Sequence, residues 1–275
     1  MLYICSTPIG NLGDITFRAV ETLKTCDYIA CETVNHTRVM LNFYGINVKL
    51  ISYREDNRES QAKAIFELLK DGKNVAVVSD AGTPAVSDPG FRLVDEALNR
   101  GFNVSVLPGV SSVVSALVLS GFPSDSFVFL GFLPRKNVKR ELVYKEISLS
   151  KRTVIFFEAP HRILKTLNEL KPFTGDRKIA LCREITKKFE EIIRGNVSEI
   201  IAKFKDRKIQ GEFTVVIEPC FEDENENDFI DEKLLESKIR MNIPTKQIIE
   251  EMLPFVKNKK ELYNKIIQMK RVNSE

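Results

Sequence analysis

The sequence predicts an α/β protein with two domains, a mainly parallel first sheet and a mixed second sheet, followed by a small helical segment. Three observations lead to this prediction. The first half alternates short apolar runs with amphipathic helical patterns, which is typical of a parallel sheet. In the second half strands outnumber helices, which favours a mixed sheet. After an acidic stretch at residues 222–231, which indicates a solvated linker, only helical patterns follow.

The first domain is expected to span residues 1–132. Its strands are apolar runs of four or five residues, and its helices repeat apolar residues on one face. The predicted strands are Leu2–Cys5, Tyr28–Cys31, Lys49–Ser52, Val75–Ser79 and Asn103–Val106, and the predicted helices are Thr16–Thr25, His36–Tyr44, Ser60–Lys70, Pro89–Arg100 and Ser111–Ser120. Asp14 or Thr16 is a suitable cap for the first of these helices, and Asp88 with Pro89 suits the start of the fourth.

A second domain is expected over residues 133–220, after a linker at residues 131–137 that contains Gly131 and Pro134. Its predicted strands are Thr153–Phe157, Lys178–Cys182, Phe189–Arg194 and Glu212–Ile217, and its predicted helix is Arg162–Leu170. The third region, residues 229–275, is predicted to hold two or three short helices. Pro244 lies near the start of one, and Leu253-Pro254 interrupts the pattern.

Composition excludes several classes of protein. The formal net charge of the 275 residues is +3, so there is no strongly basic or acidic balance, and no apolar run is long enough for a membrane span. The N-terminus resembles a strand and not a signal peptide. Five cysteines without a Cys-x-x-Cys pair favour reduced thiols in the cytoplasm. The two histidines, His36 and His161, belong to no metal-ligand pattern, and neither a G-x-S-x-G elbow nor a Walker A motif occurs.

Three glycine-bearing loops of the first domain each follow a predicted strand. They are Ser6–Asp14, Asp80–Gly90 and Leu107–Ser112. Ligands bind at the carboxyl ends of strands in open α/β sheets, and Gly82 would let a molecule approach the backbone. Each loop alone is explained by a tight turn or a helix cap, and the G-x-x-G spacing of the first is not that of a dinucleotide-binding loop. Together, the three loops predict one ligand cleft.

The second domain contributes charged residues that are candidates for polar contacts with a ligand. Glu158, His161 and Arg162 follow a strand, although Glu158 and Arg162 are equally explained as an ion pair at a helix start. Gly211 begins a strand and would allow close backbone approach. A basic segment follows the first domain, with the cations Arg135, Lys136, Lys139, Arg140, Lys151 and Arg152 opposed by Glu141 and Glu146. It predicts either contact with RNA phosphates or a solvated helix face.

In this order, the motifs resemble the tetrapyrrole methylase superfamily and, within it, the ribosomal RNA small subunit methyltransferase I family. The resemblance covers about residues 2–218. It rests on the runs Ser6–Asp14, Asp80–Pro84, Ser87–Gly90, Gly131–Lys136, Glu158–Arg162, Arg183–Lys188 and Gly211–Phe213. A single one of these runs is weak, whereas the ordered set is specific.

The resemblance implies a two-domain tetrapyrrole-methylase-like fold with a small helical C-terminal domain. It also implies S-adenosylmethionine-dependent methylation of the ribose 2′-oxygen of a cytidine in 16S rRNA of the small ribosomal subunit, by a cytoplasmic homodimer with neither membrane nor DNA as partner. The donor would lie between the two α/β domains. The implied cofactor contacts are Pro8, Asp80, Ala81, Gly82, Val86, Ser111, Ser112, Phe157 and Thr214.

The carboxylates near the motifs are the candidates for a general base: Glu32, Asp80, Glu158 and Glu184. The sequence does not choose among them, and positioning of the substrate can suffice without a base. Arg135, Lys136, Lys139 and Arg140 are the predicted RNA contacts.

Two segments depart from the family pattern. Thr33-Val34-Asn35 stands where the family has Asp-Thr-Arg, and Tyr53–Asn57 replaces a histidine-rich tract. Both are expected in loops that face the cleft. They leave open two other functions, which are a methyltransferase for a small tetrapyrrole-like molecule and a non-catalytic RNA-binding or assembly protein with the same fold.

Overall fold

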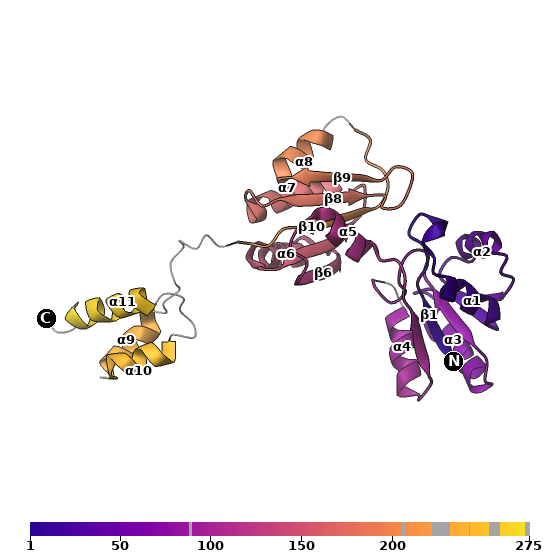
Figure 1. Cartoon of the computed structure of the whole chain (residues 1–275), viewed down its shortest axis with the longest axis horizontal. Coiled ribbons are helices and arrows are strands. Elements are labelled where there is room, and N and C mark those ends of the chain that lie inside the picture. Colours follow the sequence, from indigo (N-terminus) through magenta and orange to yellow (C-terminus); the bar gives the residue numbers. More distant parts are fainter. Residues whose placement is uncertain (88–89, 205–206, 222–231, 242, 253–258, 273–275) are drawn as a thin grey trace. The chain divides into compact units, whose positions relative to one another are not determined.

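The computed structural model describes residues 1–87, 90–204, 207–221, 232–241, 243–252 and 259–272. The chain forms two compact units, Met1–Cys220 and Phe221–Glu275. The first unit contains two five-stranded sheets, and the second contains three helices (Figure 1). None of the described helices has the length and apolar character needed to cross a membrane.

The first sheet is entirely parallel and has the strand order β3-β2-β4-β1-β5. Its strands are β1 Leu2–Cys5, β2 Tyr28–Cys31, β3 Lys49–Ser52, β4 Val75–Val78 and β5 Val104–Leu107. Three of these match the predicted bounds, β4 ends one residue earlier than predicted, and β5 is shifted by one residue at both ends. Parallel strands with both faces covered are continuous apolar runs, which made them readable from sequence.

Helices cover both faces of the first sheet. They are α1 Phe17–Thr25, α2 Val34–Phe43, α3 Arg58–Lys70 and α4 Gly90–Asn99. Along β4, Val75 and Val77 pack in the cluster with α3 and α4. Ala76 and Val78 point the other way and pack in the cluster with α1 and α2. The alternation of side chains along a strand thus places two helices on each face.

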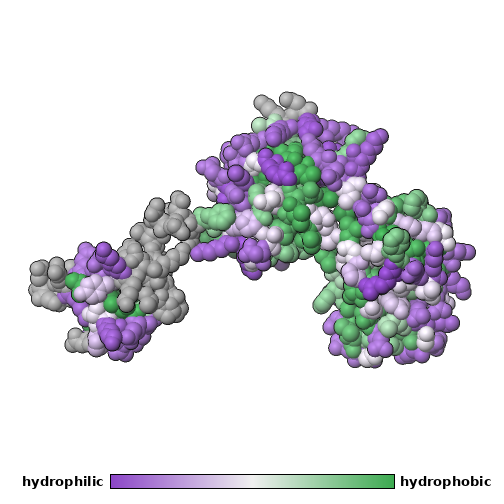
Figure 2. Space-filling view, viewed as in Figure 1, coloured by the Kyte–Doolittle hydropathy of each residue, from purple (hydrophilic) through white to green (hydrophobic). Residues whose placement is uncertain are grey.

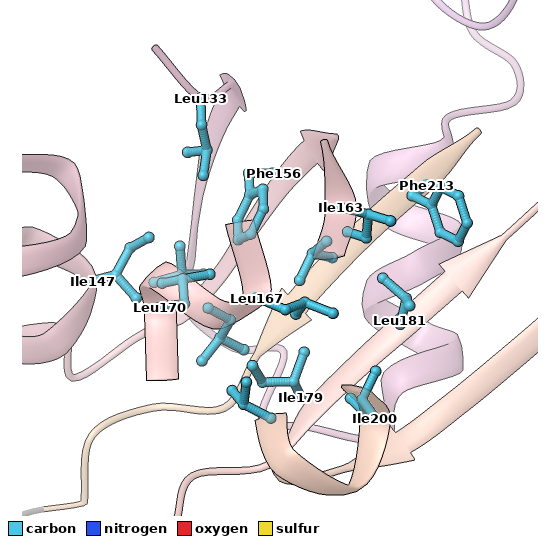
Figure 3. Packing of buried hydrophobic residues seen from close by; sticks show 14 of the residues in the cluster. Leu133, Ile147, Phe156, Ile163, Leu167, Leu170, Ile179, Leu181, Ile200 and Phe213 are labelled. Atoms are coloured by element: carbon cyan, nitrogen blue, oxygen red, sulfur yellow. The ribbon is translucent and has the colours of Figure 1, made fainter. Parts of the chain in front are cut away.

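The second sheet is mixed, as predicted, with the order β6-β7-β10-β8-β9. Its strands are β6 Phe127–Phe132, β7 Thr153–Glu158, β8 Ile179–Arg183, β9 Glu191–Gly195 and β10 Phe213–Ile217. Only β6 and β7 are parallel to each other. Helices α6 Asn137–Leu149, α7 Ile163–Thr174 and α8 Val197–Phe204 pack on one face, around Phe156, Leu167 and Ile200 (Figure 3).

Helix α5, Ser112–Ser120, belongs to the second sheet. Its residues Val113, Ala116 and Leu117 pack against the opposite face from α7, beside Ala180 and Val216. The chain passes from the first sheet to the second after β5, whereas the boundary at residue 132 stays a prediction. The cause is that β6, at the predicted end of the first domain, pairs with β7, and that the direction of α5 depends on contacts more than 60 residues away.

Several further elements differ from the prediction. Strand β6 and helix α6 were not predicted, and the bounds of α3, α7 and β9 differ by two or more residues at one end. Helix α8 was missed, although Asn196 and Glu199 form a reciprocal capping box: the Glu199 amide donates to Asn196 and the Asn196 amide donates to Glu199. Helix α2 begins at Val34, two residues before the predicted start. At α1, Thr16 and not Asp14 is the cap, since its hydroxyl accepts from the Ala19 amide at 3.2 Å. The predicted cap Asp88 and the neighbouring Pro89 lie outside the described residues.

The second unit consists of α9 Glu232–Arg240, α10 Thr245–Met252 and α11 Lys259–Val272. Its core contains Leu235, Ile239, Ile248, Leu262 and Ile266. Three helices agree with the predicted two or three, and Pro244 directly precedes α10. The compact unit spans Phe221–Glu275, and the domain start at residue 229 stays a prediction. The predicted linker at residues 222–231 and the Leu253-Pro254 interruption lie outside the described residues.

Candidate active site

A pocket of about 400 Å³ lies within the first unit, between the ends of strands from both sheets. From the first sheet it is lined by loops after β1, β2, β4 and β5, and from the second by β6, β7, β10 and the loop after β8. The lining residues are Ile9, Glu32, Asp80, Ala81, Gly82, Thr83, Val86, Ser87, Ser111, Ser112, Val113, Phe132, Phe157, Glu158, Ala159, Pro160, Ile185, Glu212, Phe213 and Thr214. The three glycine-bearing loops of the first sheet converge here, as predicted.

Backbone hydrogen bonds join the first two of these loops. The Thr7 amide donates to the Gly82 carbonyl at 2.9 Å, and the Gly82 amide donates back to the Thr7 carbonyl at 3.0 Å. Gly82 has a φ of +79°, a conformation that residues with a Cβ rarely adopt. The glycine is therefore required by the turn and the bridge, which is a different reason from the predicted close approach of a ligand.

Hydroxyl groups join the second loop to both the first and the third. The Ser6 and Thr83 hydroxyls lie 3.0 Å apart, and the Thr83 hydroxyl donates to the Val110 carbonyl at 3.3 Å. Ser111 is the N-cap residue of α5, but its side chain forms no capping hydrogen bond. The alternative explanation of Ser111 as a helix cap therefore fails, and its hydroxyl is available to a molecule in the pocket.

The loop after β4 contains left-handed backbone at residues other than glycine. Ala85 and Ser87 have φ values of +72° and +65°. Such conformations are energetically unfavourable for residues with a Cβ and persist where the surrounding structure imposes them, often at binding sites. Ser87 lines the pocket, and nothing in the sequence marks an alanine or a serine for this role.

Glu158 is held in place from three sides. Its side chain is fully buried, and one oxygen accepts from the Ala159 amide at 2.8 Å and pairs with Arg162 at 3.1 Å. The other oxygen accepts from the Thr166 hydroxyl at 2.7 Å. The ion pair with Arg162 at the start of α7 is the one anticipated from sequence. These contacts give Glu158 a structural role at the base of the pocket.

Glu184 is likewise engaged. It accepts from the Glu212 amide at 2.9 Å and from the Lys187 ammonium at 3.0 Å. Burial alone would raise the pKa of Glu184, but these two hydrogen bonds together with the charges of Lys187 and Arg183 hold the pKa below its ordinary value. Gly211 has a φ of +95°, and a Cβ there would lie 2.6 Å from the Glu184 side chain. Gly211 therefore permits the approach of Glu184, which joins two loops beside the pocket and does not line it.

Glu32 and Asp80 face the pocket from adjacent strands. Register places Cys31 of β2 beside Val78 of β4, so the residues that follow these strands are neighbours. One oxygen of Asp80 accepts from the Thr33 amide at 3.1 Å. Burial, and then the charge of Asp80, raise the pKa of Glu32. Within the described parts of the chain, the Glu32 carboxylate forms neither a hydrogen bond nor an ion pair.

The residues implied as cofactor contacts are nearly all brought together. Asp80, Ala81, Gly82, Val86, Ser111, Ser112, Phe157 and Thr214 line the pocket, and Pro8 does not. Of the four candidate bases, Glu32, Asp80 and Glu158 line it, and Glu184 lies outside. Sequence reasoning missed Phe132 and Glu212, which lie within the recognised motifs and were not singled out there.

The pocket suits S-adenosylmethionine in size and charge. Its volume lies within the usual range for ligand sites. Four of the described lining residues are carboxylates, namely Glu32, Asp80, Glu158 and Glu212. Arg162 and Lys187 pair with Glu158 and Glu212, so Glu32 and Asp80 carry the negative charge that no described cation pairs with. An acidic lining favours a cationic ligand, which a sulfonium is. In the described part of the chain, no group of three or more His, Cys, Asp or Glu residues is placed to hold a metal ion.

The basic segment surrounds α6: Arg135 and Lys136 precede the helix, Lys139 and Arg140 lie in its first turn, and Lys151 and Arg152 follow its end. Arg135, Lys136 and Lys139 are exposed, and none of the three takes part in an ion pair with another described residue. Arg140 differs from the expectation: its side chain is 5% exposed and pairs with Glu169 at 2.8 Å. The reason is helical geometry, since Arg140 lies on the face of α6 that packs against α7. Arg140 is therefore removed from the set of phosphate contacts.

The segment that departs from the family pattern lies partly in a helix and not wholly in a loop. Thr33 is the N-cap residue of α2, and Val34 and Asn35 form its first turn. Thr33 and Asn35 are exposed, as expected, whereas Val34 packs against the core of the first domain. The other departing segment, residues 53–57, leads into α3, and its Tyr53 is buried.

Comparison with known proteins gives one consistent family. Tetrapyrrole (Corrin/Porphyrin) Methylases match residues 1–201. The chain is 47% identical to the ribosomal RNA small subunit methyltransferase I of Thermotoga maritima, over 78% of this chain and 97% of that protein. It is 38% identical to the protein of the same name from Rickettsia prowazekii, over 98% of this chain and 97% of the relative.

Solved structures agree in fold. A cobalt precorrin-4 methyltransferase superposes with a TM-score of 0.61 at 16% identity, over 79% of this chain and 94% of that one. A uroporphyrin-III C-methyltransferase from Thermus thermophilus gives a TM-score of 0.54 at 20% identity, over 78% and 93% of the two chains. These confirm the expected tetrapyrrole-methylase-like fold. With the sequence relatives, they show that the chain belongs to the ribosomal RNA small subunit methyltransferase I family of the tetrapyrrole methylases.

Proposed function

We propose that this protein transfers a methyl group from S-adenosylmethionine to the ribose 2′-oxygen of a cytidine in 16S rRNA of the small ribosomal subunit. The juxtaposition of an acidic pocket and a basic helix start is the main support. The pocket suits a cationic methyl donor, and the exposed cations that follow β6 suit a polyanionic acceptor. Relatives with 38–47% identity bear the name of rRNA methyltransferases.

The two features are close in the chain. Phe132 lines the pocket, and Arg135 follows three residues later, so their Cα atoms are at most about 11 Å apart. The Phe132 side chain is 59% exposed and contacts Phe157, with ring centroids 5.4 Å apart. An exposed aromatic ring can stack on a nucleobase. RNA bound along Arg135, Lys136 and Lys139 would thus reach a pocket with an aromatic wall.

The chain's own residues would act chiefly by orientation. The sulfonium donor supplies an already activated methyl group when bound. Ser111 and Ser112 would hold its polar groups by their hydroxyls, and the carboxylates of Asp80 and Glu32 would favour its positive charge. Alignment of the 2′-oxygen with the carbon–sulfur bond can contribute about 7–11 kcal/mol to lowering the barrier. The fixed loops around the pocket provide the rigidity that such alignment requires.

We propose in addition that the enzyme acts as a homodimer in the cytoplasm, where its rRNA substrate is made. Apolar side chains gather around α5 on the visible face of the molecule (Figure 2). Val114 and Val118 of α5 are 53% and 71% exposed. A second copy of the chain would bury such residues, which supports the dimer.

The test is methyl transfer to small subunits from a strain that lacks this protein, with tritiated donor and mapping of the product. We expect an alkali-resistant dinucleotide containing cytidine, because a 2′-O-methyl group blocks hydrolysis of the adjoining phosphodiester. Label on a base, or label only on a tetrapyrrole, would contradict the proposal. Ala81→Leu adds bulk to the pocket and should weaken donor binding at least tenfold, while Ala202→Leu on α8 should leave it unchanged.

The basic start of α6 is tested by reversing the charges of Arg135, Lys136 and Lys139 to glutamate. We expect weaker RNA binding and a salt dependence whose logarithmic slope falls by about 2, since each lost phosphate contact removes about 0.7–0.9. Donor affinity measured by calorimetry should not change. The matched control reverses three exposed lysines on other helices, Lys24, Lys63 and Lys203. An equal loss of RNA affinity in that control would show a general charge effect only.

A further inference from the structure

The carboxylates that line the pocket differ in the number of hydrogen bonds and ion pairs that they form. Glu158 is buried and bound by three donors. Glu212 is largely exposed and pairs with Lys187 at 3.0 Å. Asp80 anchors the start of α2 through the Thr33 amide. Among the described residues, Glu32 alone of these four has no hydrogen bond or ion pair.

The position of Glu32 is fixed by the sheet. It directly follows β2, whose last residue pairs with the last residue of β4, and the strand holds its backbone close to Asp80. Of the other charged groups nearby, Glu158 and Glu212 line the pocket from the second sheet. Arg38 of α2 lies near the neighbouring Cys31, where its charge lowers the pKa of the Cys31 thiol against the larger effect of burial. Partial burial and the charge of Asp80 both favour protonation of Glu32.

From this geometry we infer that Glu32 accepts the proton of the ribose 2′-hydroxyl during methyl transfer. The inference rests on the proposed function. As the bond between the 2′-oxygen and the methyl carbon forms, the carbon–sulfur bond breaks and its electron pair stays on sulfur. The hydroxyl proton passes to a Glu32 carboxylate oxygen and later to solvent. The positive charge of the donor and the negative charge of the carboxylate are both lost, so charge balances.

The pocket explains why this carboxylate suits the role better than its neighbours. A base must be free of strong donors and must have a pKa nearer to the working pH than an exposed carboxylate has. Glu32 meets the first condition by its lack of partners and the second by burial beside Asp80. Glu158 fails the first condition, and Glu184 does not line the pocket.

The test compares Glu32→Gln with Glu21→Gln, a control on the exposed surface of α1. Under single-turnover conditions with saturating donor and RNA, we expect Glu32→Gln to slow transfer about a hundredfold to ten-thousandfold. Its donor affinity should fall far less than its rate, because the Asp80 charge remains in the pocket, and its melting temperature should not fall. The wild-type rate should rise with pH through the Glu32 pKa, and this acid limb should vanish in Glu32→Gln. Glu21→Gln should match the wild type.

Asp80→Asn provides a second readout that does not depend on turnover. Removal of the neighbouring charge should lower the Glu32 pKa, as followed by ¹³C-carboxyl NMR of the protein without ligands, and should move the acid limb to lower pH. A Glu32→Gln variant that keeps the wild-type rate and acid limb would overturn the role of Glu32 while leaving the proposed function intact. A wild-type protein that methylates no small-subunit RNA would overturn both.

Discussion

The two sides of the pocket carry the same kinds of side chain in different states. On the side of the first sheet, Glu32 has no partner among the described residues, and the Ser111 side chain makes no capping bond. On the side of the second sheet, Glu158 and Glu184 are saturated by hydrogen bonds and ion pairs. A carboxylate beside a pocket is therefore no sign of chemistry in itself. Its partners decide whether it binds a ligand or holds the fold.

The difference follows from how each side is built. The loops of the first sheet are held by backbone bonds and small hydroxyl groups, such as the Thr7–Gly82 bridge and the Ser6–Thr83 contact. The loops of the second sheet are joined by the backbone bond from Glu184 to Glu212 and also by charged side chains, since Glu184 accepts from the Lys187 ammonium. On the first side Glu32 is left free, whereas Glu158 and Glu184 are occupied on the second.

The largest effect on stability is expected for Glu158→Ala. This change removes a fully buried carboxylate and leaves the Arg162 guanidinium and the Thr166 hydroxyl without their acceptor. Breaking a buried ion pair costs about 3–5 kcal/mol. Urea denaturation at neutral pH should show a loss of this size. If instead the variant is as stable as the wild type but loses activity, Glu158 serves the reaction and not the fold. The contrast between the two sides of the pocket would then be wrong.

A smaller loss, about 2 kcal/mol, is expected for Glu184→Gln, since hydrogen bonds to a charged acceptor contribute about 1.5–3 kcal/mol. The pKa of Glu184 is lowered in the folded protein, so its stabilisation is present above the ordinary carboxyl pKa and is lost as pH falls through the lowered value. The difference between variant and wild type should therefore be full at pH 7 and should shrink in acid. Denaturation curves at several pH values measure this.

A constant difference across that pH range would mean that the Glu184 charge does not stabilise the fold. Glu212→Gln is the matched control, since Glu212 is 76% exposed and also pairs with Lys187. An exposed ion pair contributes little, so this control should lose less than about 1 kcal/mol.

The smallest effect on stability is expected for the segment Thr33-Val34-Asn35, which differs from the family pattern and lies on the first-sheet side of the pocket. Thr33→Asp combined with Asn35→Arg changes two exposed positions and leaves the packed Val34 in place. Stability should change by less than about 0.5 kcal/mol, because surface substitutions away from special contacts usually do. The rate of methyl transfer should change, since Thr33 contacts Asp80 through its amide.

The control for this double variant is donor affinity, which should remain unchanged in calorimetry. A large fall in melting temperature with wild-type kinetics would show that the segment serves the fold and not the substrate. That result would contradict the view that the first-sheet side of the pocket serves the substrate and the second-sheet side serves the fold.

Much of the site was readable from local sequence. The strands β1, β2 and β4 end where apolar runs stop, and residues of the loops that follow them line the pocket. The ion pair of Glu158 with Arg162 was also readable, because residues four apart at a helix start lie within reach of each other. What local sequence misses is a helix such as α8, whose capping box was overlooked, and a strained loop such as 85–87, whose residues do not mark it.

Periodicity and caps act over a few residues, so local sequence indicates most of the strands and helices and the loops that line the pocket. Contacts between distant segments fix which sheet α5 and β6 join, which carboxylate remains free, and that Arg140 turns inward to Glu169, 29 residues away. The physical reason is the same in each case. A side chain's state depends on partners that pack against it from distant parts of the chain, and local patterns do not encode those partners.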